Sequence, residues 1–314
     1  MDYADMGKQR LIVITGPTAT GKTALGALLA ESINGEVVSA DSMQVYKYMD
    51  VGTAKPTVTE KQGVPHHMLD VAAPWEDYSV ARYVTDASRC VDDILQRGKL
   101  PVIVGGTGLY IDSLISGREF SDRGDGALRG ELEKEYDTLG GAAMLRKLRG
   151  FDPESASKLF ANDKKRIVRA FEVYKTTGKT ISQHDAETRG IPPRYNAVKY
   201  ALTFAERAVL YSRIDARADK MIADGLGDEV RGLLDMGLKP GSTAMQAIGY
   251  KEIAGVILGC YDMDAAVAQI KKESRRYAKR QLTWLRRDTR VHWITWEKEP
   301  DFARLKREVY HTES

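Results

Sequence analysis

A glycine-rich loop near the start of the chain has the residue types and the spacing of a phosphate-binding loop. Gly16 is followed five residues later by Gly21, Lys22 and Thr23, in the pattern G-x-x-x-x-G-K-[ST]. Successive backbone N–H groups and a helix N-terminus would form an anion cradle there. Lys22 would add a positive charge, and the Thr23 hydroxyl would be a ligand for Mg²⁺. The loop predicts bound phosphate groups, but it does not identify the molecule that carries them.

A carboxylate, Asp41, ends the next short apolar segment, GEVVSAD, at residues 35–41. At the end of a strand this side chain would lie beside the phosphate loop, where it could accept a proton from a nucleophile or position Mg²⁺ through water. The alternative is a turn residue or a helix N-cap. The place of Asp41 at a strand end in a phosphate-binding sheet favours catalysis.

A third apolar segment matters for the acid that it lacks. The stretch LPVIVGGTGLY, residues 100–110, runs into Thr107, whereas many nucleotide hydrolases end such a strand with an acid that holds Mg²⁺. The chain also contains no Asn-Lys-x-Asp string for reading guanine. These absences disfavour a GTPase or a motor ATPase. They leave enzymes that transfer a group from a diphosphate-bearing donor, small-molecule kinases included.

The elements that must position these residues alternate along the first third of the chain. Residues 11–15 predict a buried strand before the phosphate loop, and leucines at helical spacing follow the loop. A helix near residues 80–97 separates the second and third strands. Short buried strands that alternate with helices predict an α/β fold of the P-loop NTPase-like kind. In it, helices flank a parallel sheet and the site lies at the carboxyl ends of the strands.

The strand signal vanishes between residues 119 and 193 and returns at 197–204 and 291–296. We therefore predict a catalytic core of residues 1–118 and 197–314 with an inserted helical domain of residues 119–196. Within the insert, Asp152 and Pro153 are typical of a helix start, and we expect Asp163 to cap a helix that ends near Gly178. A second G-K-T string begins at Gly178, but it follows a helix and not a strand, so we expect a helix C-cap there.

The bulk composition is that of a soluble globular protein. Hydrophobic residues make up 43% and charged residues 29% of the chain, and no apolar run approaches the ~20 residues of a membrane span. The polar start MDYADMGKQR lacks a signal-peptide core. Cys90 and Cys260 are far apart and have no metal-binding spacing. We expect a cytoplasmic protein with no membrane contact.

Positive charge is concentrated in two segments, although the net charge is only +3. Residues 271–290 contain nine Lys and Arg against two acidic residues, and a second cluster, KKRIVR, spans residues 164–169. Such runs are often solvated helix faces. Two separate basic segments in a nearly neutral protein favour a polyanionic partner.

Several further blocks carry a resemblance to a known family. They are DSMQVYKYMDVGTAKP from Asp41, GVPHHMLDV from Gly63, VGGTGLY from Val104, NDKKRIVRAFEV from Asn162, MQAIGYKE from Met245 and KRQLTWLR from Lys279. Together with GPTATGKT they resemble the tRNA dimethylallyltransferase family, also called tRNA isopentenyltransferases, over nearly the whole chain and in the same order. The chain stops without the zinc finger of many eukaryotic relatives, so it is similar to the compact bacterial form.

The resemblance implies a prenyl transfer that depends on Mg²⁺. The donor would be dimethylallyl diphosphate, and the acceptor N6 of the adenosine 3′ of the anticodon in tRNA. Asp41 would be the general base, and Thr107 would lie opposite in the channel. Lys22 and Arg217 would face the leaving diphosphate, with Arg213 as the alternative to Arg217. The diphosphate would be bound by Gly16, Pro17, Thr18, Ala19, Thr20, Gly21, Lys22 and Thr23, with Mg²⁺ at Thr23.

The resemblance also implies how tRNA is bound. The target base must leave its stack to reach a buried channel, and the basic segments would hold the RNA backbone. The insert would clamp the anticodon stem. The residues implied in tRNA binding are Asp41, Ser42, Met43, Gln44, Thr107, Lys165, Arg166, Ile167, Val168, Arg169, Lys279, Arg280, Gln281 and Arg286. No protein partner is evident.

We expect several aromatic and histidine side chains to stabilise the fold and to take no part in the reaction. His66 and His67 lack partners at metal-binding spacing, so we expect packing or hydrogen bonding. We predict that Tyr277, Trp284 and the tryptophans at 293 and 296 are core residues.

Two other functions stay open from the residues alone. In a small-molecule kinase, the insert would be a lid and the basic helix a solvated face. In a non-catalytic RNA-binding protein, the phosphate loop would be a relic. The intact Lys22, Thr23 and Asp41 disfavour the second of these.

Overall fold

The computed structural model describes residues 10–117 and 126–302, and these fall into two compact units. The first unit combines the chain before residue 118 with the chain after residue 193, and the second consists of residues 118–193. The sequence placed the insert at 119–196. Residues 1–9 of the polar segment at the start of the chain and residues 119–125 of the predicted insert lie outside the described residues.

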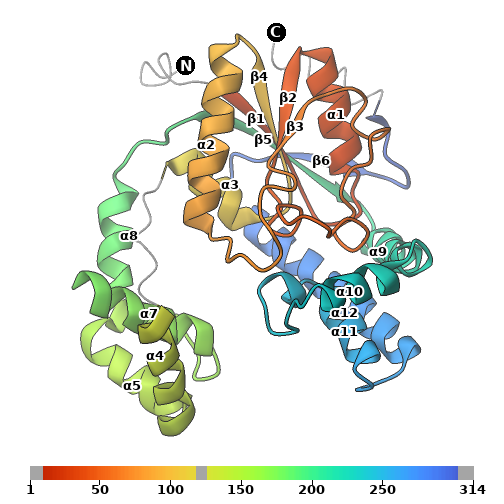
Figure 1. The fold of residues 1–314 in the computed structure, drawn as a ribbon. Helices are drawn as coiled ribbons and strands as arrows, with labels where there is room; N and C mark the ends of the chain where they lie inside the picture. The colour runs from red at the N-terminus through yellow and green to blue at the C-terminus, as the bar shows by residue number, and fades with distance from the viewer. Residues whose placement is uncertain (1–9, 118–125, 303–314) are drawn as a thin grey trace. The chain divides into compact units, whose positions relative to one another are not determined.

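A parallel sheet of six strands forms the centre of the first unit, in the order β3-β2-β4-β1-β5-β6 (Figure 1). The strands are β1 Arg10–Thr15, β2 Gly35–Ser39, β3 His66–His67, β4 Leu100–Val104, β5 Asn196–Phe204 and β6 His292–Trp296. The predicted parallel α/β sheet is confirmed. Only β3 was missed, because two residues are too short to produce a periodic pattern.

Both faces of the sheet are buried, which explains why its strands are continuous apolar runs. Leu11 and Val13 belong to one core cluster, whereas Ile12 and Ile14 belong to another, as alternation along a strand requires. Helices α2 (Val80–Gln96) and α3 (Gly108–Ser116) supply the first cluster, and α1 (Lys22–Ser32) supplies the second. Figure 1 shows α1 on the opposite side of the sheet from α2 and α3.

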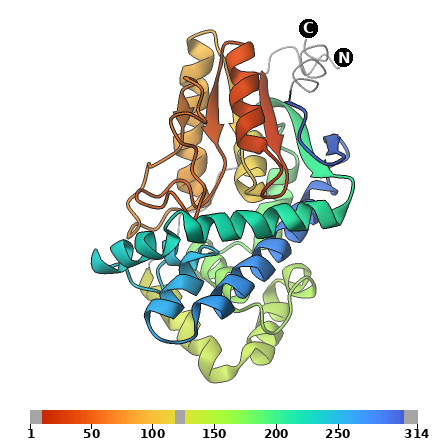
Figure 2. The same ribbon diagram turned by 90° about the vertical axis from the view of Figure 1, so that its right-hand side faces the viewer.

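Two long helices cross one end of this sheet, α9 (Arg207–Ala223) and α12 (Met263–Leu285) (Figure 2). They pack against each other, and two ion pairs join them. Arg275 lies 2.6 Å from Asp215, and Lys271 lies 2.7 Å from Asp219. Part of the positive charge of α12 is therefore used to hold the two helices together. Helices α10 (Leu226–Asp235) and α11 (Tyr250–Ile257) complete this layer.

The second unit consists of helices with a small core of their own. These are α4 Gly126–Leu139, α5 Gly141–Phe151, α6 Pro153–Ser157, α7 Lys164–Thr177 and α8 Ile181–Arg189. The Asp152 carboxylate accepts a hydrogen bond from the Ser155 amide at 3.0 Å and caps α6, as expected. Asp163 precedes α7 as expected, but its carboxylate accepts from the Phe160 amide and does not cap the helix. Gly178 ends α7 in the left-handed conformation, φ 73°, which confirms that the second G-K-T string is a helix terminus.

Candidate functional site

A cavity of about 350 Å³ lies where the carboxyl ends of the central strands meet α9 and α12. Its walls come from the segments that follow β1, β2 and β4 and from one side of each helix. This is the position predicted for the site, because parallel strands direct their carboxyl ends to the same edge of a sheet.

The phosphate loop forms one end of the cavity. Thr18, Lys22 and Thr23 line it directly, whereas the other loop residues (Gly16, Pro17, Ala19, Thr20 and Gly21) form the turn behind them. Gly16 has a φ of 139°, and a Cβ there would lie 2.4 Å from the Leu202 carbonyl oxygen, so the loop can pass β5 only with glycine. The loop is also held from behind, since the Trp296 indole N–H donates to the Thr20 carbonyl at 3.1 Å.

Lys22 and Arg217 place two basic side chains close to one carboxylate, Asp41. Burial and the nearby Arg217 guanidinium lower the pKa of Lys22 to about 7, and Asp41 opposes this shift. Part of the Lys22 side chain remains accessible, but its ammonium group lies among protein atoms and donates to the Pro17 carbonyl at 2.7 Å. Burial also lowers the pKa of Arg217. The cavity therefore favours an anion.

The structure distinguishes the two candidate arginines. Arg217 lines the cavity, and its guanidinium lies 3.5 Å from the Thr53 carbonyl oxygen. Arg213 is not among the lining residues and forms an ion pair with Glu299 at 2.7 Å. Arg217 is thus the arginine that can face a ligand in the cavity.

Asp41 lines the same cavity and makes a turn of its own. Its Oδ1 accepts hydrogen bonds from the Met43 amide at 2.9 Å and the Gln44 amide at 3.4 Å, whereas Oδ2 has no hydrogen-bond partner among the described residues. The predicted turn role and the predicted catalytic role are therefore compatible. Strand β4 lies between β2 and the strand of the phosphate loop, so Asp41 does not follow an adjacent strand, but it lines the same cavity as Lys22 and Thr23.

Thr107 supports the segment that follows Asp41. Its hydroxyl accepts a hydrogen bond from the Ser42 amide at 3.0 Å and donates to the Ser42 hydroxyl at 3.4 Å. Burial raises the pKa of Tyr277 to about 12. Tyr277 lines the cavity, so the prediction that it is a core residue was wrong. Helical spacing correctly identified the side of α12 that faces the protein interior. At Tyr277 this side borders the cavity and is not packed against the core.

Two glutamines implied in tRNA binding have their amides engaged within the protein. Gln281 is 6% exposed; it accepts from the Thr18 amide at 3.2 Å and donates to the Gly106 carbonyl at 2.9 Å. It thereby joins the phosphate loop to the end of β4. Gln44 Nε2 lies 3.2 Å from both the Thr53 and the Ala54 carbonyl oxygens. Both glutamines line the cavity, as do Ser42 and Met43.

Basic residues near the end of α12 remain available beyond those paired with α9, as does Lys272, which is exposed and forms no ion pair among the described residues. Lys279 and Arg286 are exposed and form no ion pair within residues 10–117 and 126–302. Arg280 lies over the Tyr277 ring at 5.5 Å from its centroid and reaches the cavity. This stretch of α12 combines free positive charge with access to the cavity mouth.

The basic segment of the insert contains both exposed and buried residues. Lys165 and Arg166 are exposed, and Arg169 pairs with Glu172 at 2.8 Å. Ile167 and Val168 are 0% and 1% exposed and pack into the core of the insert, so the prediction that these two side chains contact RNA was wrong. The family resemblance implies RNA contact for all five consecutive residues 165–169. In a helix, however, consecutive side chains point to different sides, so only some of them can face RNA.

The remaining aromatic and histidine residues are mostly structural. Trp296 is 5% exposed as predicted, but Trp293 is 39% exposed, which corrects its assignment to the core. Trp284 packs against the core and donates to Asp112 at 2.7 Å. The two histidines form hydrogen bonds as expected, His66 with the Val64 carbonyl and His67 with Glu36.

Other site types are absent from the part of the chain that the structure describes. Within it, no group of three or more His, Cys, Asp or Glu is arranged to hold a metal ion. None of its helices has both the length and the apolar character needed to cross a bilayer.

Comparison with family models gives two overlapping matches. A model described as IPP transferase matches residues 44–288, and a model described as isopentenyl transferase matches residues 9–73. The two together cover the cavity walls and the insert.

Proteins named tRNA dimethylallyltransferase are similar to this chain. The chain is 50% identical over 292 residues to the one from Carboxydothermus hydrogenoformans, covering 93% of each sequence. It is 48% identical to the one from Acetivibrio thermocellus, covering 90% of this chain and 91% of the relative.

Solved structures are similar over the same length. The tRNA isopentenylpyrophosphate transferase of Bacillus halodurans has a TM-score of 0.73 at 41% identity, with 98% of this chain and 96% of that chain covered. A eukaryotic dimethylallyltransferase described as acting on tRNA has a TM-score of 0.78 at 27% identity, with 97% of this chain and 77% of that chain covered.

Proposed function

The chain belongs to the IPP transferase family, and from this premise we propose that it is a tRNA dimethylallyltransferase. It would transfer the dimethylallyl group of dimethylallyl diphosphate to N6 of the adenosine 3′ of the anticodon and release diphosphate. The observation that carries the proposal is a single cavity with a cationic phosphate loop at one end, an apolar wall and the Asp41 carboxylate. Because its substrate would be tRNA, we place the reaction in the cytoplasm.

The donor fits the cavity in two parts. Its diphosphate matches the phosphate loop, where Lys22 and Arg217 supply positive charge and backbone amides supply donors. Its hydrocarbon matches the apolar lining from α9 and α12, which includes Ile214 and Ile270, both 2% exposed. A nucleoside triphosphate would place a polar ribose and base against this lining, which is one reason to disfavour the kinase.

The acceptor is a poor nucleophile, because the lone pair of an adenine amino group is delocalised into the ring. Asp41 would accept a hydrogen bond from N6, orient it and take up its proton as the bond from N6 to the allylic carbon forms. The bond between that carbon and the diphosphate oxygen breaks at the same time. The turn that Asp41 makes with the Met43 amide fixes its carboxylate for this role.

The departing diphosphate must be stabilised as negative charge develops on it. Lys22, Arg217 and the loop amides are arranged for this purpose before the reaction begins, in a cavity where water screens them little. Burial of both cations costs free energy in the free enzyme, and an anionic ligand offsets that cost. Thr107 and Gln281 would keep the opposing walls in place.

Mg²⁺ would bind chiefly through the diphosphate. Since the described residues hold no acidic cluster, the Thr23 hydroxyl in the cavity wall would be the protein ligand, with diphosphate oxygens and water completing the shell. This donor set suits Mg²⁺, which keeps several waters and is often held by substrate phosphates. When bound, the ion would neutralise charge on the leaving group.

tRNA would be held by the free basic residues described above. Lys279 and Arg280 lie on the helix that borders the cavity, Arg286 directly follows that helix, and Lys165 and Arg166 lie on the insert. Phosphate contacts of this kind help to offset the few kcal/mol needed to unstack a base. The adenosine could then enter the cavity and reach Asp41.

The proposal is tested by incubating the protein with unmodified tRNA, dimethylallyl diphosphate and Mg²⁺, followed by mass spectrometry of the nucleosides. We expect adenosine at the position 3′ of the anticodon to gain one dimethylallyl group. Calorimetry with ATP and with dimethylallyl diphosphate separates the kinase, since tight ATP binding without donor binding would favour it. Binding of tRNA without turnover, unaffected by Lys22→Ala, would favour a non-catalytic RNA-binding protein.

A further inference from the structure

Glu229, on α10, binds three consecutive backbone amides of a distant segment. Its carboxylate accepts from the amides of Asp50 and Val51, both at 2.8 Å, and of Gly52 at 3.1 Å. The hydroxyl of Tyr250, the first residue of α11, donates to the same carboxylate at 2.5 Å. Neither Glu229 nor Tyr250 lines the cavity. One side chain thus holds a turn that lies almost 180 residues earlier in the chain.

The segment held by Glu229 forms a wall of the cavity. Gly52, Thr53, Ala54 and Pro56 all line it, and they follow directly after the clamped amides. A Cβ on Gly52 would lie 2.4 Å from the Tyr250 ring, so the backbone packs against α11 too closely for any side chain at this position. Ala54 has a φ of 43°, which is unfavourable for a residue with a side chain and persists only where surrounding contacts enforce it.

This wall in turn orients two polar side chains of the cavity. The Thr53 and Ala54 carbonyls both accept from the Gln44 amide, which places Gln44 beside the turn of Asp41. The Thr53 carbonyl also lies 3.5 Å from the guanidinium of Arg217. A displacement of residues 52–54 would therefore move acceptors that help to direct Arg217 toward the phosphate loop.

We propose that Glu229 is a positioning residue for the diphosphate end of the cavity, acting through residues 50–54; this inference rests on the proposed function. A carboxylate has two oxygens that accept, and here they satisfy three amides and a hydroxyl. An amide side chain in its place retains one accepting oxygen and turns an N–H₂ group toward the donors. Some of the clamped amides then lose their acceptor, and the strained turn relaxes.

The test uses the full chain with Glu229→Gln and measures steady-state transfer together with the binding of inorganic diphosphate in Mg²⁺. We expect the KM for dimethylallyl diphosphate and the Kd for inorganic diphosphate to rise about tenfold, the size expected for losing hydrogen bonds to a charged group. The Kd for tRNA should stay within about twofold, because the clamp does not touch the exposed basic residues. Tyr250→Phe removes one donor and keeps the ring, so it should give a smaller rise in the same two quantities.

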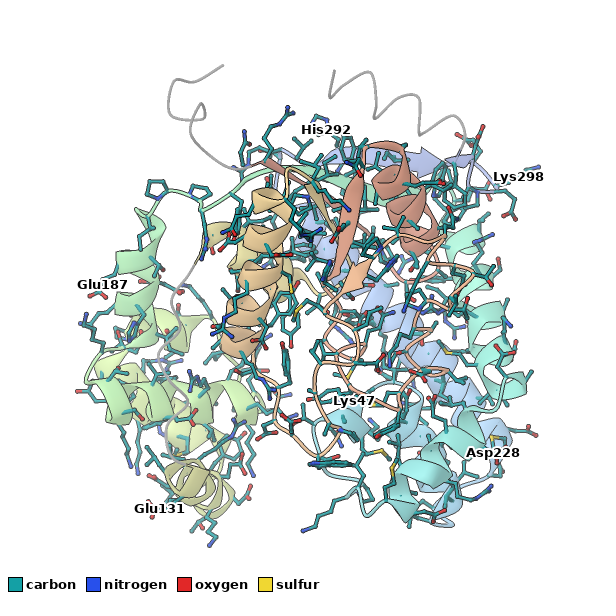
Figure 3. The ribbon with its side chains drawn as sticks, turned by 45° about the horizontal axis from the view of Figure 1, so that its top comes forward. Lys47, Glu131, Glu187, Asp228, His292 and Lys298 are labelled. Carbon is teal, nitrogen blue, oxygen red and sulfur yellow. The ribbon has the colours of Figure 1, made fainter. Side chains whose placement is uncertain are left out.

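Asp228→Asn is the matched control. Asp228, labelled in Figure 3, lies on the same helix, is 86% exposed and pairs only with Arg231 among the described residues, so its loss should leave both quantities unchanged. In an Arg217→Ala background, Glu229→Gln should weaken diphosphate binding much less than it does alone, because the group that it positions is gone.

Three results would overturn the inference. One is wild-type diphosphate affinity in Glu229→Gln. Another is an equal rise in the constants for donor and tRNA, which indicates general loosening of the fold. The third is full additivity with Arg217→Ala. Failure of the proposed function is a separate outcome, since it would appear as absent prenyl transfer by the wild-type protein even if Glu229 governs diphosphate binding.

Discussion

At the scale of single residues, the cavity places positive charge around one carboxylate. Lys22 and Arg217 are held among protein atoms with Asp41 as the nearby acid, so the site carries an excess of positive charge. Burial disfavours such charges, and an anionic ligand reverses the effect. The arrangement therefore favours a phosphate-bearing ligand over a neutral one. The residues that line the cavity would determine how that ligand is oriented.

Gln281 provides a residue-scale test, because sequence resemblance and structure suggest different roles for it. Gln281→Met removes both hydrogen bonds at nearly constant volume, so the Thr18 amide and the Gly106 carbonyl lose their partner. We expect the KM for dimethylallyl diphosphate to rise about tenfold, as for the loss of two buried hydrogen bonds, with little change in the Kd for tRNA. A weaker tRNA complex with an unaltered donor KM would instead support the RNA contact.

At the scale of elements, α12 has two kinds of basic residue. Lys271 and Arg275 are paired with acids of α9 and hold the two helices together. Lys279, farther along the helix, and Arg286, directly after its end, form no ion pair within the described part of the chain. In the sequence, the paired and the unpaired basic residues look alike. Only the ion pairs in the structure show which of them hold helices together and which are available to bind a polyanion.

This division predicts a difference in the salt dependence of tRNA binding. Replacing Lys279 and Arg286 together by Ala should reduce the slope of log Kd against log salt concentration by about 1.4 to 1.8, because each phosphate contact contributes ~0.7–0.9. Lys271→Ala should leave the slope unchanged, since its charge is neutralised by Asp219. Filter binding or fluorescence anisotropy across a salt series measures both. Equal slopes for the two variants would contradict the division.

Strand β2 depends on a buried acid, Glu36, whose side chain is 3% exposed. Arg97, Lys99 and His67 all donate to its carboxylate, and chiefly through Arg97 they hold its pKa well below the ordinary range. Because the pKa of Glu36 is lower in the folded state, its ionised carboxylate stabilises the fold. This contribution to the free energy of unfolding is complete above the unfolded-state pKa of about 4.3, and it is lost as the pH falls toward the folded-state pKa.

Glu36→Gln should therefore lower the free energy of unfolding by about 2 kcal/mol at pH 7, the partial exposure of the cations keeping the loss below that of a fully buried pair. The difference between variant and wild type should narrow below about pH 4. Urea denaturation at several pH values measures this. Asp93→Asn, at a carboxylate that is 60% exposed, is the control and should cost less than about 1 kcal/mol. A pH-independent difference would contradict the assignment.

At the scale of the whole molecule, local patterns in the sequence predicted the parallel sheet and the helices between residues 126 and 189, and they predict that the loop at residues 16–23 binds phosphate. These features depend on residues that are close in the chain, such as Gly16 with Lys22 or Asp152 with Pro153. The roles of Glu229, Gln281 and Trp296 could not be predicted in this way. Each contacts a segment more than 170 residues away, and no local pattern records which amide or carbonyl it will meet.

The wrong predictions have a common physical cause. Helical spacing shows which residues share a face, but it does not show whether that face meets a core, a cavity or solvent. Tyr277 was assigned to the core and lines the cavity, whereas Ile167 and Val168 were assigned to RNA and lie in a core. Trp293 is large and apolar, yet it lies in the edge strand β6 and is partly exposed.

The central claim is that Asp41 activates the adenosine at the mouth of a cavity that holds the prenyl donor. It is tested most directly by single-turnover transfer to tRNA with wild type and Asp41→Ala, together with the Kd for tRNA. The account predicts a rate that falls by about 10²–10⁴, the usual contribution of a general base, with a tRNA affinity within about threefold of wild type. An Asp41→Ala enzyme that transfers the prenyl group at the wild-type rate would contradict it.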